Sequence, residues 1–139
     1  MKKICVIDGQ GGGIGSAIIK KLKETFGETI EIIALGTNAI ATANMLKARA
    51  NRGASGENAI IHTIKNVDII VGPLSILMAN GMMGEVTPNV AEAVSSASAE
   101  KMLIPLTQEN VTVIGISQMP LPHFIEDLID VHLSQKELV

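Results

Sequence analysis

The sequence is poor in aromatic residues and in cysteine. It contains no tyrosine and no tryptophan, and its two phenylalanines are Phe26 and Phe124. Many enzymes use tyrosine as a proton donor, and nucleobases often stack on aromatic rings, so the chain lacks the usual side chains for both tasks. The single cysteine, Cys5, excludes an intramolecular disulfide and a thiolate metal cluster. Its apolar neighbours predict a buried, inert thiol.

Positive charge and long apolar runs are also scarce. The formal net charge is -3 and the lysines form only short groups, which predicts that the protein has no nucleic-acid partner. The apolar run before Asp8 is too short for a signal peptide, and residues 69–83 are too few and too polar to span a membrane. The histidines at 62, 123 and 132 lack the spacing of metal ligands. We therefore predict a cytoplasmic protein without a membrane segment or a metal site.

Length and patterning favour one Rossmann-like nucleotide-binding domain over residues 1–139. β-branched apolar runs predict strands at 3–7, 30–35, 67–71, 102–106 and 111–116. Helical periodicity predicts helices at 14–25, 39–50 and 57–65, from Pro88 and from Pro122. This alternation is typical of a three-layer α/β fold with an open, mostly parallel sheet. Because only residues 107–110 separate the last two strands, we expect an antiparallel hairpin there and the strand order 2-1-3-4-5.

The most informative segment lies where the first strand becomes the first helix. It reads Asp8-Gly9-Gln10-Gly11-Gly12-Gly13-Ile14-Gly15-Ser16. Glycines let an anion approach the main chain closely, and a helix N-terminus directs unpaired N–H groups at it. The segment therefore predicts a turn that binds a small phosphorylated or anionic molecule, with the Ser16 hydroxyl nearby. The alternative is a tight turn that only lets the helix pack close to the sheet.

The glycine spacing narrows the possible ligands. The dinucleotide pattern G-x-G-x-x-G fails because position 14 is isoleucine. The spacing G-x-x-x-G-x-G is met by Gly9, Gly13 and Gly15, and it resembles the cofactor turn of short-chain dehydrogenases, which makes NAD or NADP a possible cofactor. Those enzymes use a catalytic tyrosine, which this chain lacks. A P-loop would have lysine at position 16, where this chain has serine.

Residues after the next strands should face the same crevice, because ligands of open parallel sheets bind outside the carboxyl ends of the strands. The candidates are Gly36, Thr37, Asn38, Gly72, Pro73 and Ser75. Thr37 and Asn38 stand where many dinucleotide sites have an acidic residue. They could suit a 2′-phosphate with Arg49 or Arg52 nearby, or one of them could cap the next helix. Asp8 could hold the turn through its own backbone, bind a metal, or act as a base.

The Met-rich connection after Pro73 has two interpretations. Residues 80–85 could cover the crevice or form a partner surface. Together with the small apolar-rich chain, this connection predicts a homo-oligomer, most simply a dimer.

Nearly the whole chain is similar to a bacterial family of short proteins catalogued as a domain of unknown function. The similar stretches are residues 6–15, 34–39, 53–59, 68–73 and 103–106. The resemblance implies a small α/β protein and no particular activity. The sequence thus favours a nucleotide- or dinucleotide-binding protein whose phosphate is held by the turn from Gly9 to Ser16. A non-catalytic small-anion sensor or oligomeric structural subunit is the alternative, and whether the chain is an enzyme stays open.

Overall fold

Five parallel strands form the central sheet of residues 1–136, the part of the chain that the computed structural model describes. They are β1 (Lys2–Asp8), β2 (Ile30–Gly36), β3 (Arg52–Ser55), β4 (Ile69–Pro73) and β5 (Glu100–Ile104). Their order across the sheet is β3-β2-β1-β4-β5, and all neighbouring pairs are parallel. The doubly wound sheet of dinucleotide-binding folds has the strand order 3-2-1-4-5-6, and its first five strands are arranged as they are here.

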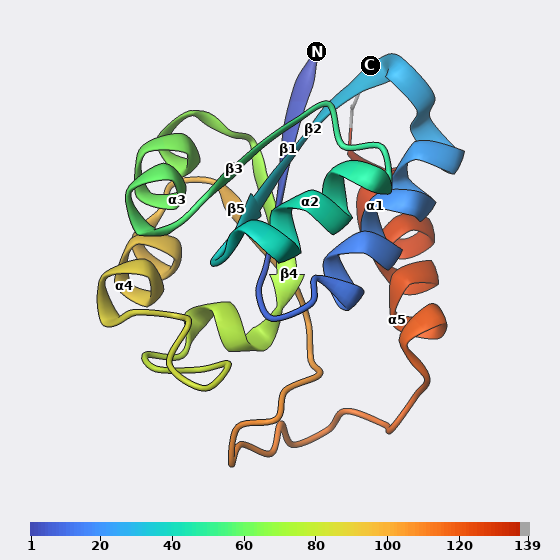
Figure 1. The fold of residues 1–139 in the computed structure, drawn as a ribbon. Coiled ribbons are helices and arrows are strands. Elements are labelled where there is room, and N and C mark those ends of the chain that lie inside the picture. The colour runs from blue at the N-terminus through green and yellow to red at the C-terminus, as the bar shows by residue number, and fades with distance from the viewer. Residues whose placement is uncertain (137–139) are drawn as a thin grey trace.

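Helices cover both faces of the sheet and make three layers (Figure 1). Apolar side chains of α1 (Gly13–Phe26), α2 (Ala39–Lys47) and α5 (Leu121–Asp127) pack in one core cluster. Those of α3 (Glu57–Thr63) and α4 (Pro88–Ser96) pack in the other. The predicted three-layer α/β architecture is confirmed.

The first strand shows why the sheet needs cover on both sides. Ile4 and Val6 belong to the cluster on the α1 side, whereas Cys5 and Ile7 belong to the cluster on the α4 side. A strand with apolar residues at successive positions is buried on both faces, as in parallel sheets. Cys5 is fully buried as predicted, and this burial raises the pKa of its thiol.

The predicted order of the strands near 3–7, 30–35, 67–71 and 102–106 is confirmed, and they correspond to β1, β2, β4 and β5. The strand predicted at 111–116 is wrong. Residues 111–116 form no strand and are exposed, so the expected antiparallel hairpin does not exist. The fifth strand is instead β3, which lies at the opposite edge and is parallel to β2. Its sequence Arg-Gly-Ala-Ser is short, polar and largely exposed, so it lacks the apolar signal by which strands are recognised.

The predicted helix starts are confirmed where a side chain caps them. The Asn38 side chain accepts a hydrogen bond from the Ala41 amide and begins α2. Thr87 does the same for Val90, with Pro88 as the first residue of α4. The helix expected to reach residue 50 ends at Lys47, because the chain must turn into β3.

Short irregular turns extend two of the helices. α3 continues as a 3-10 turn, Ile64–Asn66. α5 continues as a π turn, Leu128–His132, and a 3-10 turn, Leu133–Gln135. Among the described residues no helix combines the length and the apolar character needed to cross a membrane.

The buried first strand yields a stability prediction. Replacing the fully buried Ile4 by alanine should lower the free energy of unfolding by about 2–5 kcal/mol, since a cavity remains in the core. The control is Ile40→Ala on α2, where the side chain is 69% exposed and the change should stay within about 0.5 kcal/mol. Urea unfolding followed by circular dichroism measures both. Equal losses would contradict the assigned burial.

Candidate functional site

A cavity of about 230 Å³ lies where the carboxyl ends of β1, β4 and β5 meet. Between β1 and β4 the direction in which the chain adds strands reverses, and such switch points are where open α/β sheets bind ligands. The lining residues are Asp8, Gln10, Ile14, Pro73, Ser75, Met82, Leu106, Thr107, Gln108 and Glu109. A larger cavity of about 530 Å³ lies along β5 and takes no residue from the glycine-rich turn.

Asp8 fastens the glycine-rich turn to the end of β1. Its Oδ1 accepts a hydrogen bond from the Gly9 amide at 2.8 Å, and its Oδ2 accepts one from the Gly15 amide at 2.7 Å. Burial raises the pKa of the Asp8 carboxyl; the Gly15 and Gly9 amides oppose the shift and the nearby Glu85 charge adds to it. Three roles were considered for Asp8: holding the turn, binding a metal and acting as a base. The structure shows that it holds the turn through hydrogen bonds to the backbone.

Glu85 joins the turn after β1 to the turn after β2. Its Oε1 accepts hydrogen bonds from the Gln10 amide at 2.8 Å, the Thr37 hydroxyl at 2.7 Å and the Asn38 side-chain amide at 2.8 Å. Burial works to raise the pKa of the Glu85 carboxyl, but these three donors outweigh it and hold the pKa below its ordinary value. A carboxylate from the Met-rich connection therefore already bonds to one amide of the predicted anion-binding turn.

Glu109 closes the other side of the cavity. Its Oε2 accepts hydrogen bonds from the Ser75 and Thr107 hydroxyls, each at 2.8 Å, and its Oε1 accepts one from the Met82 amide at 3.0 Å. The Thr107 and Ser75 hydroxyls hold the pKa of Glu109 below its ordinary value. The carboxylates of Asp8 and Glu109 thus line the cavity, and its lining contains no lysine or arginine. The cavity itself is rich in acceptors and unfavourable for a phosphate.

The glycines of the turn divide into two groups. At Gly9 and Gly15 an added Cβ would collide with neighbouring side chains, and Gly12 has a left-handed φ of 72° and lies against the Ala41 carbonyl. At Gly11 and Gly13 a Cβ would meet nothing within 4 Å, and neither has a left-handed φ. Among residues 1–136 no hydrogen bond is formed by the amides of these two glycines.

The pattern extends to the whole chain, which has thirteen glycines. Gly12, Gly27, Gly56, Gly84 and Gly115 have a left-handed φ, and at Gly9, Gly15, Gly36, Gly53, Gly72 and Gly81 a Cβ would lie 3.0 Å or closer to another atom. Packing or backbone conformation therefore accounts for every glycine except Gly11 and Gly13. Both of these are exposed at the N-terminus of α1.

Only some of the predicted site residues line the cavity. These are Asp8, Gln10, Ile14, Pro73 and Ser75. Gly36 and Gly72 pack inside the fold, and Thr37 and Asn38 contact Glu85 rather than the cavity. The Ser16 hydroxyl is buried, with no hydrogen-bond partner in the described part of the chain.

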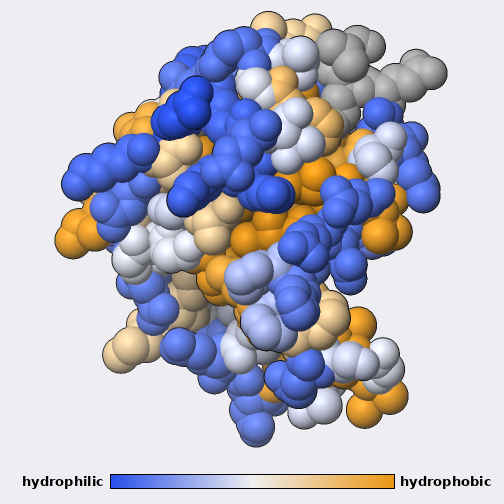
Figure 2. Space-filling model, turned by 90° about the vertical axis from the view of Figure 1, so that its right-hand side faces the viewer, coloured by the Kyte–Doolittle hydropathy of each residue, from blue (hydrophilic) through white to orange (hydrophobic). Residues whose placement is uncertain are grey.

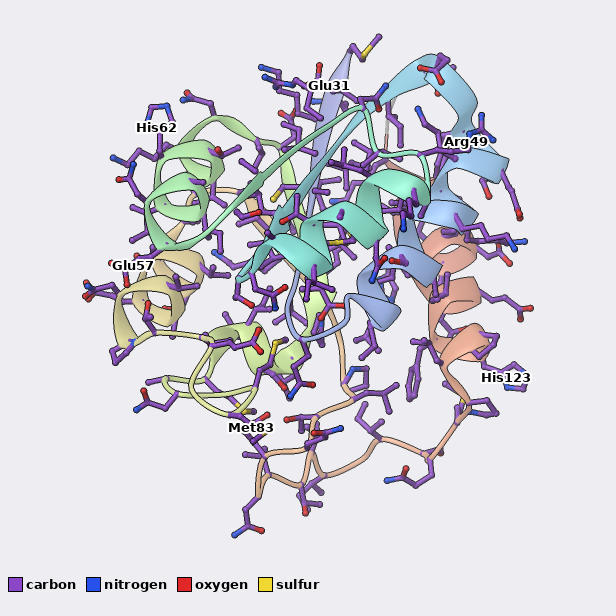
Figure 3. The ribbon with its side chains drawn as sticks, viewed as in Figure 1. Glu31, Arg49, Glu57, His62, Met83 and His123 are labelled. Atoms are coloured by element: carbon purple, nitrogen blue, oxygen red, sulfur yellow. The ribbon has the colours of Figure 1, made fainter. Side chains whose placement is uncertain are left out.

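The arginines considered for a 2′-phosphate lie elsewhere. Arg52 pairs with Glu31 at 2.6 Å between an Nη2 and an Oε1 atom. Figure 3 shows Glu31 and Arg49 toward the end of the molecule where β1 begins, away from Met83 in the loop beside the cavity. His62 and His123 lie on opposite sides of the molecule in the same figure. Within residues 1–136 no three acidic, histidine or cysteine side chains gather closely enough to hold a metal ion.

Sequence reasoning missed Glu85, Thr107 and Glu109 as site residues. Residues 107–110 were expected to form a hairpin turn, and residues 80–85 were considered only as a cover or a partner surface. The loop after β5 reaches the cavity because all five strands are parallel and their carboxyl ends share one edge of the sheet. Met82 lines the cavity while Met83 is 91% exposed, so this connection contributes to the cavity wall.

The chain belongs to the domain of unknown function family DUF3842, whose model matches residues 3–137. No curated protein matches it. Among solved structures it is similar to a dodecameric FMN-dependent UbiX-like decarboxylase from Escherichia coli O157:H7. The TM-score is 0.47 and the identity 17%, over 94% of this chain and 75% of that chain.

The contacts of Glu85 predict a pH-dependent stability. The folded-state pKa of Glu85 is lowered, so its contribution is present above the unfolded pKa, about 4.3, and is lost as the pH falls through the folded value. Glu85→Gln should therefore lower the free energy of unfolding by about 1–3 kcal/mol at pH 7, and the difference from the unmodified protein should vanish in acid.

Urea unfolding between pH 7 and pH 3 measures this difference. The control is Glu24→Gln on α1, an exposed position that should give no difference at either pH. A loss for Glu85→Gln that stays constant across the range would contradict the ionised contact.

Proposed function

We propose that this protein binds a small sugar phosphate or nucleotide across the switch point of the sheet. The phosphate lies against the free amides of Gly11 and Gly13 at the N-terminus of α1. The sugar hydroxyls enter the cavity and donate to its carboxylates. The observation that carries the proposal is that Gly11 and Gly13 are the two glycines for which neither packing nor backbone conformation gives a reason.

The N-terminus of α1 supplies the anion-binding half of the site. α1 is 14 residues long, and the unpaired amides at its start carry the partial positive charge of the helix. Side chains at positions 11 and 13 would stand in the open space from which an anion approaches the backbone. Asp8 accepts hydrogen bonds from the Gly9 and Gly15 amides, and the Ile14 amide also acts on its carboxyl. The Gln10 amide donates to Glu85 and the Gly12 amide to the Gly9 carbonyl, so the amides left for a ligand are those of Gly11 and Gly13.

The cavity supplies the half that recognises hydroxyl groups. Asp8 and Glu109 offer carboxylate oxygens, and Ser75 and Thr107 offer hydroxyls, without a balancing cation in the lining. A carboxylate binds O–H and N–H donors well and repels a phosphate. The donor-rich, uncharged part of the ligand therefore belongs in the cavity and its phosphate outside, over α1.

The scarcity of aromatic residues limits what a base could add. With no tyrosine or tryptophan in the chain, and neither phenylalanine in the cavity lining, a nucleobase finds no ring to stack on. Affinity then comes from the phosphate and the sugar. We expect ribose 5-phosphate to bind about as well as AMP, and NAD or NADP to gain little from their second nucleotide.

A calorimetric comparison tests the phosphate half. Inorganic phosphate, ribose 5-phosphate, AMP, ATP, NAD, NADP and FMN are each added during thermal unfolding. A ligand at 100 times its dissociation constant should add about 2.7 kcal/mol to the free energy of unfolding. Gly13→Val should abolish this gain, because the side chain fills the approach to the amides, while the unliganded protein changes by less than about 1 kcal/mol.

Pro88→Val is the matched control, since it places valine at the first residue of α4 and should leave the ligand response unchanged. If no compound stabilises the protein, or if Gly13→Val responds as the unmodified protein does, the proposal is wrong. Equal stabilisation by inorganic phosphate and by ribose 5-phosphate would instead favour the small-anion sensor, which needs only the Gly11 and Gly13 amides.

Glu109→Gln tests the sugar half. The change keeps the shape and one acceptor oxygen but removes the charge, and hydrogen bonds to charged groups contribute about 1.5–3 kcal/mol. We expect titration calorimetry to show an affinity for ribose 5-phosphate lowered about 10-fold to 100-fold, with the affinity for inorganic phosphate unchanged. Glu126→Gln, an exposed residue of α5, is the control. An equal loss for both ligands would mean that Glu109 does not recognise the sugar.

A further inference from the structure

The sheet ends at β5 with one unpaired edge. β5 pairs with β4 on one side, and no strand of residues 1–136 pairs with its other side. The cavity of about 530 Å³ lies along this free edge. β5 forms one wall. The other wall is lined by Gly115, Ile116, Ser117, Met119, Phe124, Leu128 and His132. This groove has the position that a sixth strand would occupy, and an open edge of this kind is a template for pairing with another chain.

A segment with strand-like residues but no strand pairing within residues 1–136 leads into this groove, and its last two residues, Gly115 and Ile116, line it. Residues 111–116 read Val-Thr-Val-Ile-Gly-Ile, and we call them the arm. In the arm Val111 is 47%, Val113 39%, Ile114 90% and Ile116 47% exposed. Figure 1 shows this part of the chain extending below the body of the molecule. Figure 2, turned about the vertical axis, shows hydrophobic surface on the same lower projection. Exposed apolar residues gathered in one segment are typical of an interaction site.

The arm is kept from pairing with β5 of its own chain. Glu109, two residues before the arm, is bonded to the Ser75 hydroxyl, the Thr107 hydroxyl and the Met82 amide at the switch point. These contacts direct the chain toward the ends of β1 and β4 instead of back along β5. A hairpin between β5 and the arm would draw Glu109 away from Ser75 and Met82, which belong to the connection after β4.

The arm and the free edge of β5 match in length and in character. Five residues of β5 span about 17 Å, and the six residues of the arm would span about 20 Å once straightened. In a single copy Ile114 and Gly115 form a turn, and Gly115 has a left-handed φ of 88°, so pairing requires this turn to open. Met102 and Ile104 of β5 contact the core on the α1 side, and Leu103 contacts the core on the α4 side, so a sixth strand would have apolar cover on both faces. In a straightened arm Val113 would point to one face, and Ile114 and Ile116 to the other, because side chains alternate along a strand.

We propose that the arm of one copy pairs with the free edge of β5 in a second copy, and that the two copies exchange arms in a two-fold symmetric dimer. The second copy is the occupant because edge and arm are complementary and lie on one molecule, so that reciprocal exchange satisfies both edges and closes the assembly. The opposite edge of the sheet is the short, polar β3, which is unsuited to such pairing. This proposal does not depend on the ligand site.

Sedimentation of the full chain at micromolar concentration tests the dimer. We expect the unmodified protein to sediment as a dimer and the double variant Val113→Lys, Ile114→Lys to sediment as a monomer, with the dissociation constant raised at least about 100-fold. Circular dichroism should show that the double variant keeps its fold, because the substituted side chains are exposed in a single copy. Ile40→Lys, which adds a lysine to exposed α2, is the control and should remain a dimer.

Amide hydrogen exchange locates the contact. In the dimer residues 111–116 and 100–104 should be protected, and in the double variant residues 111–116 should lose protection. An unmodified protein that is monomeric overturns the proposal. If its arm is nevertheless protected, the arm has paired with its own β5. A dimer that survives the double substitution, or one whose arm exchanges freely, also overturns it, because the interface then lies elsewhere.

Discussion

The fold of this protein depends on how the Asp8 carboxylate holds the start of α1. One carboxylate oxygen accepts a hydrogen bond from the Gly9 amide, and the other accepts one from the Gly15 amide. These two bonds fix the end of β1 to the first turn of α1. A buried carboxylate is costly unless donors surround it, and the unpaired amides of a helix N-terminus are the donors most readily available. The close approach requires Gly15, where a Cβ would lie 2.9 Å from that of Asp8. Several of the glycines thus serve the fold, whereas neither packing nor a left-handed φ requires glycine at positions 11 and 13.

A second constraint follows from the other two carboxylates. Glu85 and Glu109 come from loops far along the chain and bond to Gln10, Thr37, Asn38, Ser75 and Met82. They tie four loops together at one edge of the sheet. The cavity at this edge is rich in acceptors, and no lysine or arginine is among its lining residues. A ligand there has to bring its own donors. In the proposed function, this charge distribution would separate two tasks that a simple phosphate-binding turn combines: hydroxyl recognition in the cavity and anion binding at the exposed amides of α1.

Local patterns predicted much of this structure. The apolar run of β1 indicated a strand buried on both faces, the glycine-rich turn marked the start of α1, and Thr87-Pro88 and Asn38 capped helices as expected. Each of these features depends only on residues a few positions away in the sequence. The prediction failed where the local signal was misleading: residues 111–116 have strand-like residues but no strand, and Arg52–Ser55 is a strand with no apolar pattern. Edge positions are where packing imposes least on the sequence, so pattern is weakest there.

The amino-acid sequence by itself determined that the chain is an α/β protein with a glycine-rich turn after its first strand, because the spacing of apolar residues and glycines acts over one strand or one helical turn. Only the tertiary structure decided which glycines are required by packing or backbone conformation and which carboxylates gather at the carboxyl edge of the sheet. Glu85 meets Gln10 across 75 residues and Glu109 meets Ser75 across 34. Contacts over such distances depend on strand order and direction, and these are fixed by how all layers pack together rather than by any one segment.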